Sequence, residues 1–191
     1  MIPQEVRHVL LTLERAGHEA YIVGGCVRDM LMENRPHDWD VTTSALPQET
    51  MALFGHSATP TGLRHGTVTV RSGELACEVT TFRTDGDYTD HRHPAAVAFT
   101  RSLREDLARR DLTVNAMAMD VRGMLHDPFG GQADIHRRVL RCVGSPGRRF
   151  SEDALRILRV LRFSATLGGF SAEENTRCAL LSRREDLRYV A

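Results

Sequence analysis

Two aspartates separated by one residue, Asp38 and Asp40, are the pair in this sequence best suited to do chemistry. Side chains two positions apart in a strand point to the same face, so the two carboxylates would lie side by side. Neighbouring carboxylates repel each other and are costly to desolvate unless a cation lies between them. The spacing therefore indicates a divalent-cation site, although the same pattern is also common in solvated loops and at strand edges.

A glycine turn precedes this pair. Residues 21–23 are typical of a strand, Gly24 and Gly25 of a turn, and the following residues of a short helix that carries Arg28. A helix that begins directly after a glycine turn offers free backbone N–H groups and the positive end of its dipole, which suits a phosphate group. Together with the aspartates, the stretch predicts a metal-dependent site for a nucleoside triphosphate.

The order Gly24-Gly25, Arg28-Asp29 and Asp38-Trp39-Asp40 resembles the first motif of the class II nucleotidyltransferases. This family includes the CCA-adding tRNA enzymes and the bacterial poly(A) polymerases. The resemblance implies an α+β fold, in which a polymerase β-like head with a mixed β-sheet flanked by helices is followed by an all-helical neck. It further implies Asp38 and Asp40 as catalytic ligands of two Mg²⁺ ions, one activating the 3′-hydroxyl of tRNA and the other steadying the triphosphate of CTP or ATP.

A third carboxylate lies in a predicted hairpin. Residues 66–71 and 74–82 are rich in β-branched residues and are separated by Ser72-Gly73, which is typical of a β-hairpin. Glu78 faces the side opposite to the apolar residues of its strand, and a glutamate in the middle of a strand is unusual unless it is paired or functional. The family's third acidic position implies Glu78 as a further catalytic residue, and a glutamate on a solvated sheet face is the alternative.

The segment after this hairpin is predicted to be a loop followed by a helix. Residues 83–99 are polar, contain Gly86 and Pro94, and correspond to a flexible loop in the family. His91 and His93 lack a third ligand at metal-binding spacing, so we interpret them as solvated. Residues 102–111 are predicted to form a helix with an acidic beginning and a basic end.

The end of this helix carries a second motif. Arg110, Asp111 and Asn115 match the R-D-x-x-x-N pattern of the family, which is associated with the ribose and triphosphate of the nucleotide. A guanidinium group can hold phosphate oxygens in a fork. A carboxylate and an amide supply acceptors and a donor for sugar hydroxyls. An ordinary surface ion pair between Arg110 and Asp111 is the alternative interpretation.

A later helix is predicted to read the base. It is expected to span residues 151–167, with Ser151 as its N-cap. Arginines lie on one side of this helix, and the other side is an apolar arc formed by Ala154, Ile157, Leu158, Val160 and Leu161. Its E-D-x-x-R pattern resembles the family's fourth motif, in which the Asp and the Arg bind the Watson–Crick edge of CTP or ATP. These residues are Asp153 and Arg156, while Arg159 and Arg162 would bind triphosphate or tRNA phosphates. The alternative is a helix with i, i+3 charge pairs on a solvent-exposed face.

The carboxylate and guanidinium of this motif suit both bases. Cytosine and adenine each carry an exocyclic amine that a carboxylate accepts from, and a guanidinium donates to a ring nitrogen or carbonyl. Uracil and guanine lack the amine at the matching place and are disfavoured. The protein would then take the role of a nucleic-acid template.

Composition places the chain among ordinary globular proteins. Its 191 residues are 41% hydrophobic and 26% charged, and no apolar run approaches the ~20 residues that span a bilayer. With no signal-peptide pattern at the start, we expect a cytoplasmic protein without a membrane partner. Residues 1–100 carry a net charge of −5 (8 Arg, 13 acidic) and residues 101–191 one of +5 (17 Arg, 12 acidic), which suits a polyanionic substrate near a cation site. The four cysteines show no C-x-x-C pair, so we expect free thiols.

The remaining segments complete the expected organisation. An amphipathic helix is predicted at residues 3–17. Further helices are predicted at residues 47–54 and 172–184, the last with a capping box that begins at Ser171, and a hairpin at residues 113–127. A turn-rich boundary near Gly144 would divide a head of residues 1–144 from the start of a neck at residues 145–191, without the family's body and tail domains.

The substrate range is open at this stage. The same motifs occur in poly(A) polymerases and in enzymes that add only A or only CC, although the loop at residues 83–99 argues against a CC-only enzyme. A module of another class that binds nucleotide or RNA without turnover is a further alternative.

Overall fold

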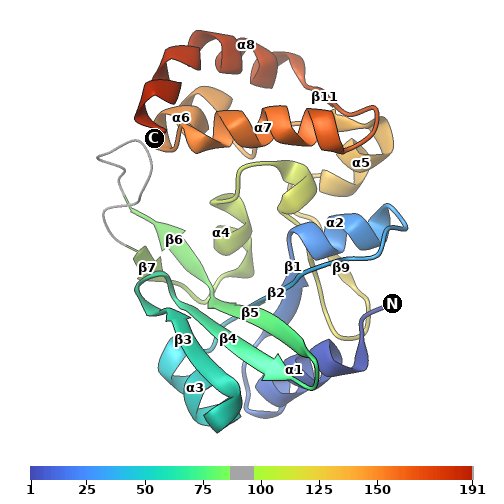
Figure 1. Ribbon diagram of the computed structural model, residues 1–191, viewed down its shortest axis with the longest axis vertical. Helices are drawn as coiled ribbons and strands as arrows, with labels where there is room; N and C mark the ends of the chain where they lie inside the picture. The colour runs from blue at the N-terminus through green and yellow to red at the C-terminus, as the bar shows by residue number, and fades with distance from the viewer. Residues whose placement is uncertain (87–96, 191) are drawn as a thin grey trace.

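A seven-stranded mixed β-sheet is the scaffold of the protein, whose computed structural model describes residues 1–86 and 97–190 (Figure 1). From edge to edge its strands are β3 (Ala58–Gly62), β4 (Thr67–Ser72), β5 (Leu75–Thr81), β2 (Trp39–Thr43), β1 (Ala20–Val23), β8 (Ala118–Met119) and β9 (Leu125–His126). The β2–β5 pair is parallel and the other pairs are antiparallel, which confirms the predicted mixed sheet.

Helices cover both faces of this sheet. The predicted helices at residues 3–17 and 47–54 are α1 (Gln4–Arg15) and α3 (Pro47–Phe54), and α1 buries Val6, Val9, Leu10 and Leu13 against one face. Along β1, Ile22 belongs to this cluster, whereas its neighbour Val23 packs with Leu107 of α4 (Leu103–Ala108) on the other face. The short helix α2 (Gly25–Leu31) follows β1 directly, as the glycine turn predicts.

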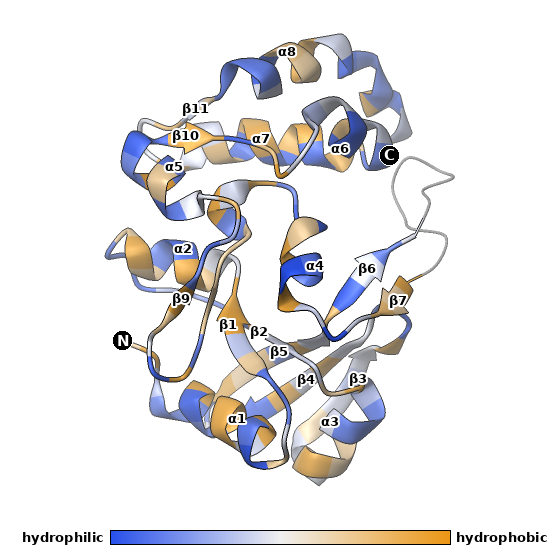
Figure 2. Cartoon of the chain, turned by 180° about the vertical axis from the view of Figure 1, so that it is seen from behind, coloured by the Kyte–Doolittle hydropathy of each residue, from blue (hydrophilic) through white to orange (hydrophobic). Residues whose placement is uncertain are grey.

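A group of helices forms the opposite end of the molecule from α1 and α3 (Figure 1). It contains α5 (Gly131–Arg137), α6 (Pro146–Glu152), α7 (Leu155–Thr166), α8 (Glu174–Ser182) and η4 (Arg184–Tyr189). Figure 2 shows hydrophobic and hydrophilic residues interleaved along α7, whose buried members join a second core cluster. This cluster takes residues from both sides of position 144, among them Leu112, Leu140, Phe150 and Ile157.

The prediction of one helix over residues 151–167 is wrong in its beginning and in its buried face. Pro146 at the first helical position starts α6 earlier, so Ser151 lies in the last turn of α6 and is not an N-cap. The chain is extended at Asp153 (φ −143°, ψ 105°), and α7 begins two residues later. Because α7 packs through an i, i+3 stripe, Leu158 and Leu161 are 39% and 46% exposed instead of buried.

Short strands account for two further differences. Ser171 does not begin a capping box, because Ser171–Ala172 (β11) pairs in parallel with β10 (Val139–Leu140), a strand pair absent from the predicted all-helical neck. The cap of α8 is Glu173, whose carboxylate accepts from the Thr176 N–H at 3.0 Å. The two ends of the predicted loop pair as β6 (Arg83–Asp85) and β7 (Val97–Phe99), while His91 and His93 fall outside the described residues.

The other boundaries shift by a few residues. Residues 113–115 form the 3₁₀ turn η3 (Thr113–Asn115) instead of a strand, so the predicted hairpin at 113–127 is reduced to the β8–β9 pair. Two more 3₁₀ turns, η1 (Gly55–Ser57) and η2 (Leu63–His65), flank β3. Within residues 1–86 and 97–190, none of the helices has the length and hydrophobicity needed to cross a membrane.

Candidate functional site

A cavity of about 620 Å³ lies where the glycine turn, β2, the end of α4 and the neck helix α7 meet. All ten residues that the sequence predicts to bind nucleotide line this cavity: Gly24, Gly25, Arg28, Arg110, Asp111, Asn115, Asp153, Arg156, Arg159 and Arg162. Asp40 lines it as well. Six residues that the sequence analysis did not assign complete the wall: His65, Arg83, Asp85, Arg109, Leu155 and Phe163.

Gly24 lets an arginine approach the backbone closely. Its φ of +80° and ψ of −128° belong to a region that side-chain-bearing residues rarely adopt. A Cβ at this position would lie 3.1 Å from Nη1 of Arg110 and 3.8 Å from Oδ2 of Asp40. The glycine therefore makes room for the Arg110 guanidinium beside the carboxylate.

Arg28 is buried and firmly held at the floor of the cavity. Its Nη2 forms an ion pair with Oδ1 of Asp29 at 2.7 Å, and its Nη1 donates to Oδ1 of Asn115 at 2.8 Å. The guanidinium also lies 5.1 Å from the centre of the Phe163 ring. These contacts join the first sequence motif to the second and to α7.

Asp106 is the partner of the arginine motif, and the sequence analysis missed it. It is fully buried and accepts from Nε of Arg109 at 2.9 Å, from Nη2 of Arg110 at 3.4 Å and from Oγ1 of Thr42 at 3.1 Å. Burial alone would raise the pKa of Asp106, but Arg110 and Arg109 outweigh it, so that this pKa is lowered. The spacing of Asp106 from the two arginines, i, i+3 and i, i+4 on one helix, is the signal that predicts such a pair.

Arg110 keeps part of its hydrogen-bonding capacity. Among the described residues its buried Nε has no hydrogen-bond partner. Burial lowers the pKa of Arg110, and the negative charges of Asp106 and Asp40 oppose this effect. A half-buried guanidinium with a buried, unsatisfied Nε donor beside an open cavity is suited to an anionic ligand.

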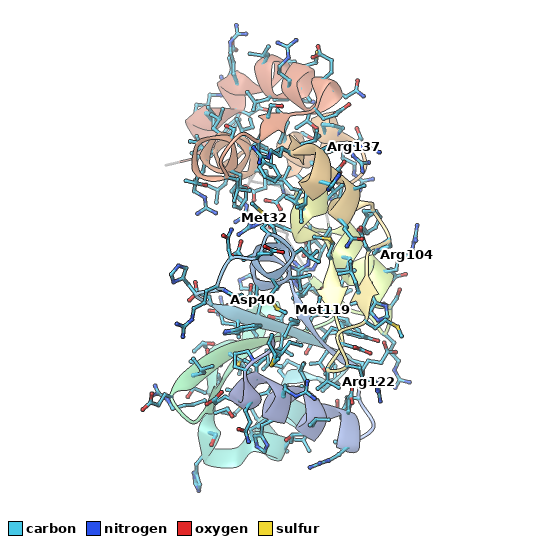
Figure 3. All side chains as sticks on the ribbon, turned by 90° about the vertical axis from the view of Figure 1, so that its right-hand side faces the viewer. Met32, Asp40, Arg104, Met119, Arg122 and Arg137 are labelled. Carbon is cyan, nitrogen blue, oxygen red and sulfur yellow. The ribbon has the colours of Figure 1, made fainter. Side chains whose placement is uncertain are left out.

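The three predicted catalytic carboxylates line a second hollow of about 400 Å³. Asp40 of β2 lies opposite Glu78 of β5 in the parallel register, and Asp38 immediately precedes β2. Asp40 belongs to the walls of both the hollow and the larger cavity (Figure 3 labels it on β2). Burial, together with the charges of Glu78 and Asp38, raises the pKa of Asp40 despite the nearby Arg110.

The hollow does not form a complete metal cage on its own. In the parts of the chain that the structure describes, no group of three or more His, Cys, Asp or Glu side chains is arranged to hold a metal ion. Magnesium, however, is usually bound by one or two carboxylates and is completed by water and substrate phosphates. The oxygen donors of Asp38 and Asp40, and the raised pKa of Asp40, fit a hard divalent cation of this kind.

The predicted base-reading pair lies at the break between α6 and α7. Oδ1 of Asp153 accepts from the N–H of Leu155, the first residue of α7, at 2.9 Å. Arg156 is only 6% exposed, and its Nη1 donates to Oε2 of Glu152 at 2.8 Å. Its Nη2 reaches the backbone oxygen of Arg109 at 3.4 Å, which ties α7 to the residue that follows α4.

Glu152 and Asp111 hold the arginines of the neck. Glu152 also accepts from Arg148 and Arg149 at 2.9 Å each, a role that the sequence analysis did not assign to the first residue of its E-D-x-x-R motif. Asp111 forms an ion pair with Nε of Arg159, and its other oxygen accepts from the Leu112 N–H. Burial would raise the pKa of Asp111, but Arg159 lowers it. Both oxygens of Asp111 are thus engaged, and its role toward a sugar stays a prediction.

The fold and this site define a nucleotidyltransferase head. Residues 20–141 match the family described as the poly A polymerase head domain, and the chain belongs to this family. Nucleotidyltransferases of this fold generally use divalent metal ions.

The relatives of the chain are named as CCA-adding enzymes. It is 50% identical to the CCA-adding enzyme of Oceanobacillus iheyensis over 96% of its own length and 45% of that protein. Its structure is similar to that of the Bacillus stearothermophilus CCA-adding enzyme in complex with CTP (TM-score 0.91, 44% identity, 100% of this chain and 46% of that one). It is also similar to a tRNA nucleotidyltransferase complexed with a primer tRNA and an incoming ATP analog (TM-score 0.73, 33% identity, 94% and 51%). The chain thus spans about half the length of these proteins.

Proposed function

We propose that this chain is the catalytic head and the first part of the neck of a CCA-adding tRNA nucleotidyltransferase. The enzyme would transfer CMP and AMP from CTP and ATP to the 3′ end of tRNA without a template and release pyrophosphate in the cytoplasm. One observation carries the proposal: a single cavity gathers all ten predicted nucleotide-binding residues and shares Asp40 with a hollow lined by three carboxylates. The division into residues 1–144 and 145–191 is part of the same proposal.

The carboxylates serve the reacting end of the nucleotide. Asp38 and Asp40 would hold two Mg²⁺ ions, with Glu78 as a third acidic residue beside them. Bound metal ions supply Lewis-acid activation of the attacking hydroxyl and charge neutralisation of the leaving pyrophosphate. Asp40 faces both the cavity and the hollow, so it positions the α-phosphate region of the nucleotide next to the acceptor end of the RNA.

The neck residues serve the base. The Asp153 carboxylate would accept a hydrogen bond from the exocyclic amine that cytosine and adenine share, and Arg156 would donate to a ring nitrogen or carbonyl. The Glu152 carboxylate fixes the Arg156 guanidinium at 2.8 Å, which restricts the directions in which it can donate. Asp153 and Arg156 would thus take the role of a template. The triphosphate and the RNA phosphates would be bound by the other arginines of the cavity, which are Arg28, Arg110, Arg159 and Arg162.

The test is nucleotide addition by the purified chain on tRNAs that end before the first C, after CC and after CCA, with CTP and ATP supplied separately. We expect CMP on the first substrate, AMP on the second and no addition to the third. Asp38→Ala and Asp40→Ala are expected to abolish addition while the circular dichroism spectrum stays unchanged. Arg122→Ala is the matched control, because Arg122 is 74% exposed and lies in the β8–β9 turn (labelled in Figure 3).

Other outcomes separate the rival functions. Repeated AMP addition to any RNA end would indicate a poly(A) polymerase, and addition of only AMP or only CMP would indicate an enzyme of narrower specificity. Binding of CTP without incorporation, even at high tRNA concentration, would favour a non-catalytic nucleotide-binding module. A folded double variant of Asp38 and Asp40 that still adds CMP would contradict the metal assignment.

A further inference from the structure

One buried aromatic ring, that of Phe163 on α7, is surrounded by three arginines. The guanidinium carbons of Arg28, Arg159 and Arg162 lie 5.1, 5.7 and 4.8 Å from the ring centre. Arg28 comes from α2 of the head, whereas the other two belong to α7 itself. Phe163 is 7% exposed, and all four residues line the 620 Å³ cavity.

The three arginines differ in their other partners. Arg28 is paired with Asp29 and Asn115, and Arg159 with Asp111. The exposed Arg162, by contrast, forms no side-chain hydrogen bond or ion pair with any residue among 1–86 and 97–190. The Phe163 ring is therefore the contact that holds the Arg162 guanidinium at the edge of the cavity.

An aromatic ring holds cations differently from a carboxylate. The negative face of the ring attracts a guanidinium without adding a net charge, whereas a carboxylate would neutralise it and compete with an incoming anion. Three like charges around one site also repel each other, and the ring offsets part of that repulsion. Arg28 and Arg159 also have carboxylate partners, whereas among the described residues Arg162 is held by the ring alone and keeps its full positive charge for an anionic ligand.

We propose that Phe163 is a positioning residue that orients the guanidinium groups of Arg28, Arg159 and Arg162 toward the triphosphate of the nucleotide. This inference rests on the proposed function, since it names a further residue of the same site. In the proposed function the base is bound by Asp153 and Arg156, whereas the arginines around the ring bind the triphosphate. Loss of the ring therefore weakens the binding of phosphate groups more than the binding of the base.

The experiment compares Phe163→Leu, which removes the ring but keeps an apolar side chain, with Phe163→Tyr, which keeps the ring. Binding of CTP and of CMP is measured by calorimetry, and KM and kcat for CTP are measured on tRNA that lacks CCA. We expect Phe163→Leu to weaken CTP binding and raise its KM about tenfold, equivalent to about 1.4 kcal/mol, with kcat and the affinity for CMP changed less than about twofold. Phe163→Tyr is expected to restore wild-type values.

Phe150→Leu is the matched control, because Phe150 is fully buried in the same core cluster as Phe163 but does not line the cavity. Its KM for CTP is expected to stay within about twofold of the wild-type value. If Phe163→Leu does not fold, Phe163→Met, which is closer in volume to phenylalanine, takes its place in the same comparison.

Three results would overturn the inference while leaving the proposed function intact: equal losses for CTP and CMP, equal effects of Leu and Tyr at position 163, or an equal rise in KM for Phe150→Leu. In each of these results the wild-type chain still adds CMP, and the ring merely packs. If the wild-type chain itself neither binds CTP nor adds CMP, the proposed function fails instead, and the two failures are told apart by this one measurement.

Discussion

Replacing Asp106 by asparagine isolates the charge of a buried carboxylate that holds the arginine motif. The carboxylate has no exposed surface and accepts from Arg109 at 2.9 Å, Arg110 at 3.4 Å, Thr42 at 3.1 Å and the backbone N–H of Arg83 at 3.3 Å. Asparagine has the same shape and still offers one acceptor oxygen, so Thr42 or Arg83 keeps a partner. The two arginines, however, lose their counter-charge.

Breaking a buried ion pair by neutralising one partner typically costs about 3–5 kcal/mol, because the other charge is left uncompensated. Arg109 and Arg110 are partly exposed, with 16% and 18% of their side-chain surface accessible, and water screens part of this loss. We therefore expect Asp106→Asn to lower the free energy of unfolding at pH 7 by about 3 kcal/mol, at the lower end of that range.

The dependence on pH gives a second, independent readout. The pKa of Asp106 is lowered in the folded protein, so its carboxylate contributes stability above its ordinary value of 3.8, and this contribution is lost as the pH falls through the lowered pKa. Asp106→Asn has no such contribution. The difference in stability between wild type and variant should thus be largest at neutral pH and should shrink on acidification.

Urea unfolding at a series of pH values from about 7 to about 3, followed by circular dichroism, measures both quantities. Glu185→Gln is the control, because Glu185 is an exposed carboxylate on η4, and it should change stability by less than about 0.5 kcal/mol. The reasoning is refuted if Asp106→Asn costs less than about 1 kcal/mol at pH 7, or if its deficit stays constant as the pH is lowered.

Three further comparisons test other parts of the protein. The pKa of Asp40 is raised in the folded protein, so its charged form lowers stability as the pH rises through that pKa. Asp40→Asn should therefore raise the thermal midpoint at pH 7, and it should abolish the stabilisation by added Mg²⁺. An unchanged response to Mg²⁺ would contradict the metal role. Gly24→Ala should lower the free energy of unfolding, measured in urea, by about 1–3 kcal/mol because of the positive φ at this position. It should also raise the KM for CTP by displacing Arg110. Wild-type values of both quantities would show that the turn tolerates a side chain. Gly131→Ala should lower the free energy of unfolding by more than about 3 kcal/mol, because its Cβ would collide with the backbone oxygen of Thr113 in η3. Gly147→Ala in α6 should raise it by about 0.5 kcal/mol, because a Cβ there meets nothing within 4 Å. Equal unfolding midpoints for the two variants would refute this contrast.

Sequence patterns predict most of the site because its key residues are fixed by local rules. The D-x-D spacing brings Asp38 and Asp40 to one hollow, although Asp38 lies in a bend just before β2 and not in the strand. The glycine turn directs the start of α2 to the cavity. Alternation along β5 separates buried Cys77 and Val79 from exposed Glu78, as the pattern predicts. What the patterns do not contain is the parallel pairing of β2 and β5, which puts Glu78 opposite Asp40 although the two strands lie far apart in sequence.

The errors concentrate where tertiary contacts override local periodicity. The buried face of α7 is set by the side on which the neck meets the head, so Arg156 is buried and Leu158 is exposed, the reverse of what hydropathy predicts. The break at Asp153 depends on α6 starting at Pro146, which a turn-like G-S-P-G sequence hides. The burial of the Asp106 carboxylate against Thr42 depends on the packing of α4 beside β2, which the spacing of Asp106 from the two arginines does not reveal.

The Asp40 carboxylate forms part of the wall of both the cavity and the hollow. A ligand that binds in one of them therefore changes the binding free energy of a ligand in the other. A cation beside Asp40 would stabilise the charged form of the carboxylate, which burial disfavours, and would change the electrostatic potential that an anion in the cavity meets. Linkage makes this influence mutual: the factor by which the cation tightens the nucleotide equals the factor by which the nucleotide tightens the cation. On the proposed function, the cation and the nucleotide would therefore bind cooperatively through the shared Asp40 carboxylate, without a conformational change.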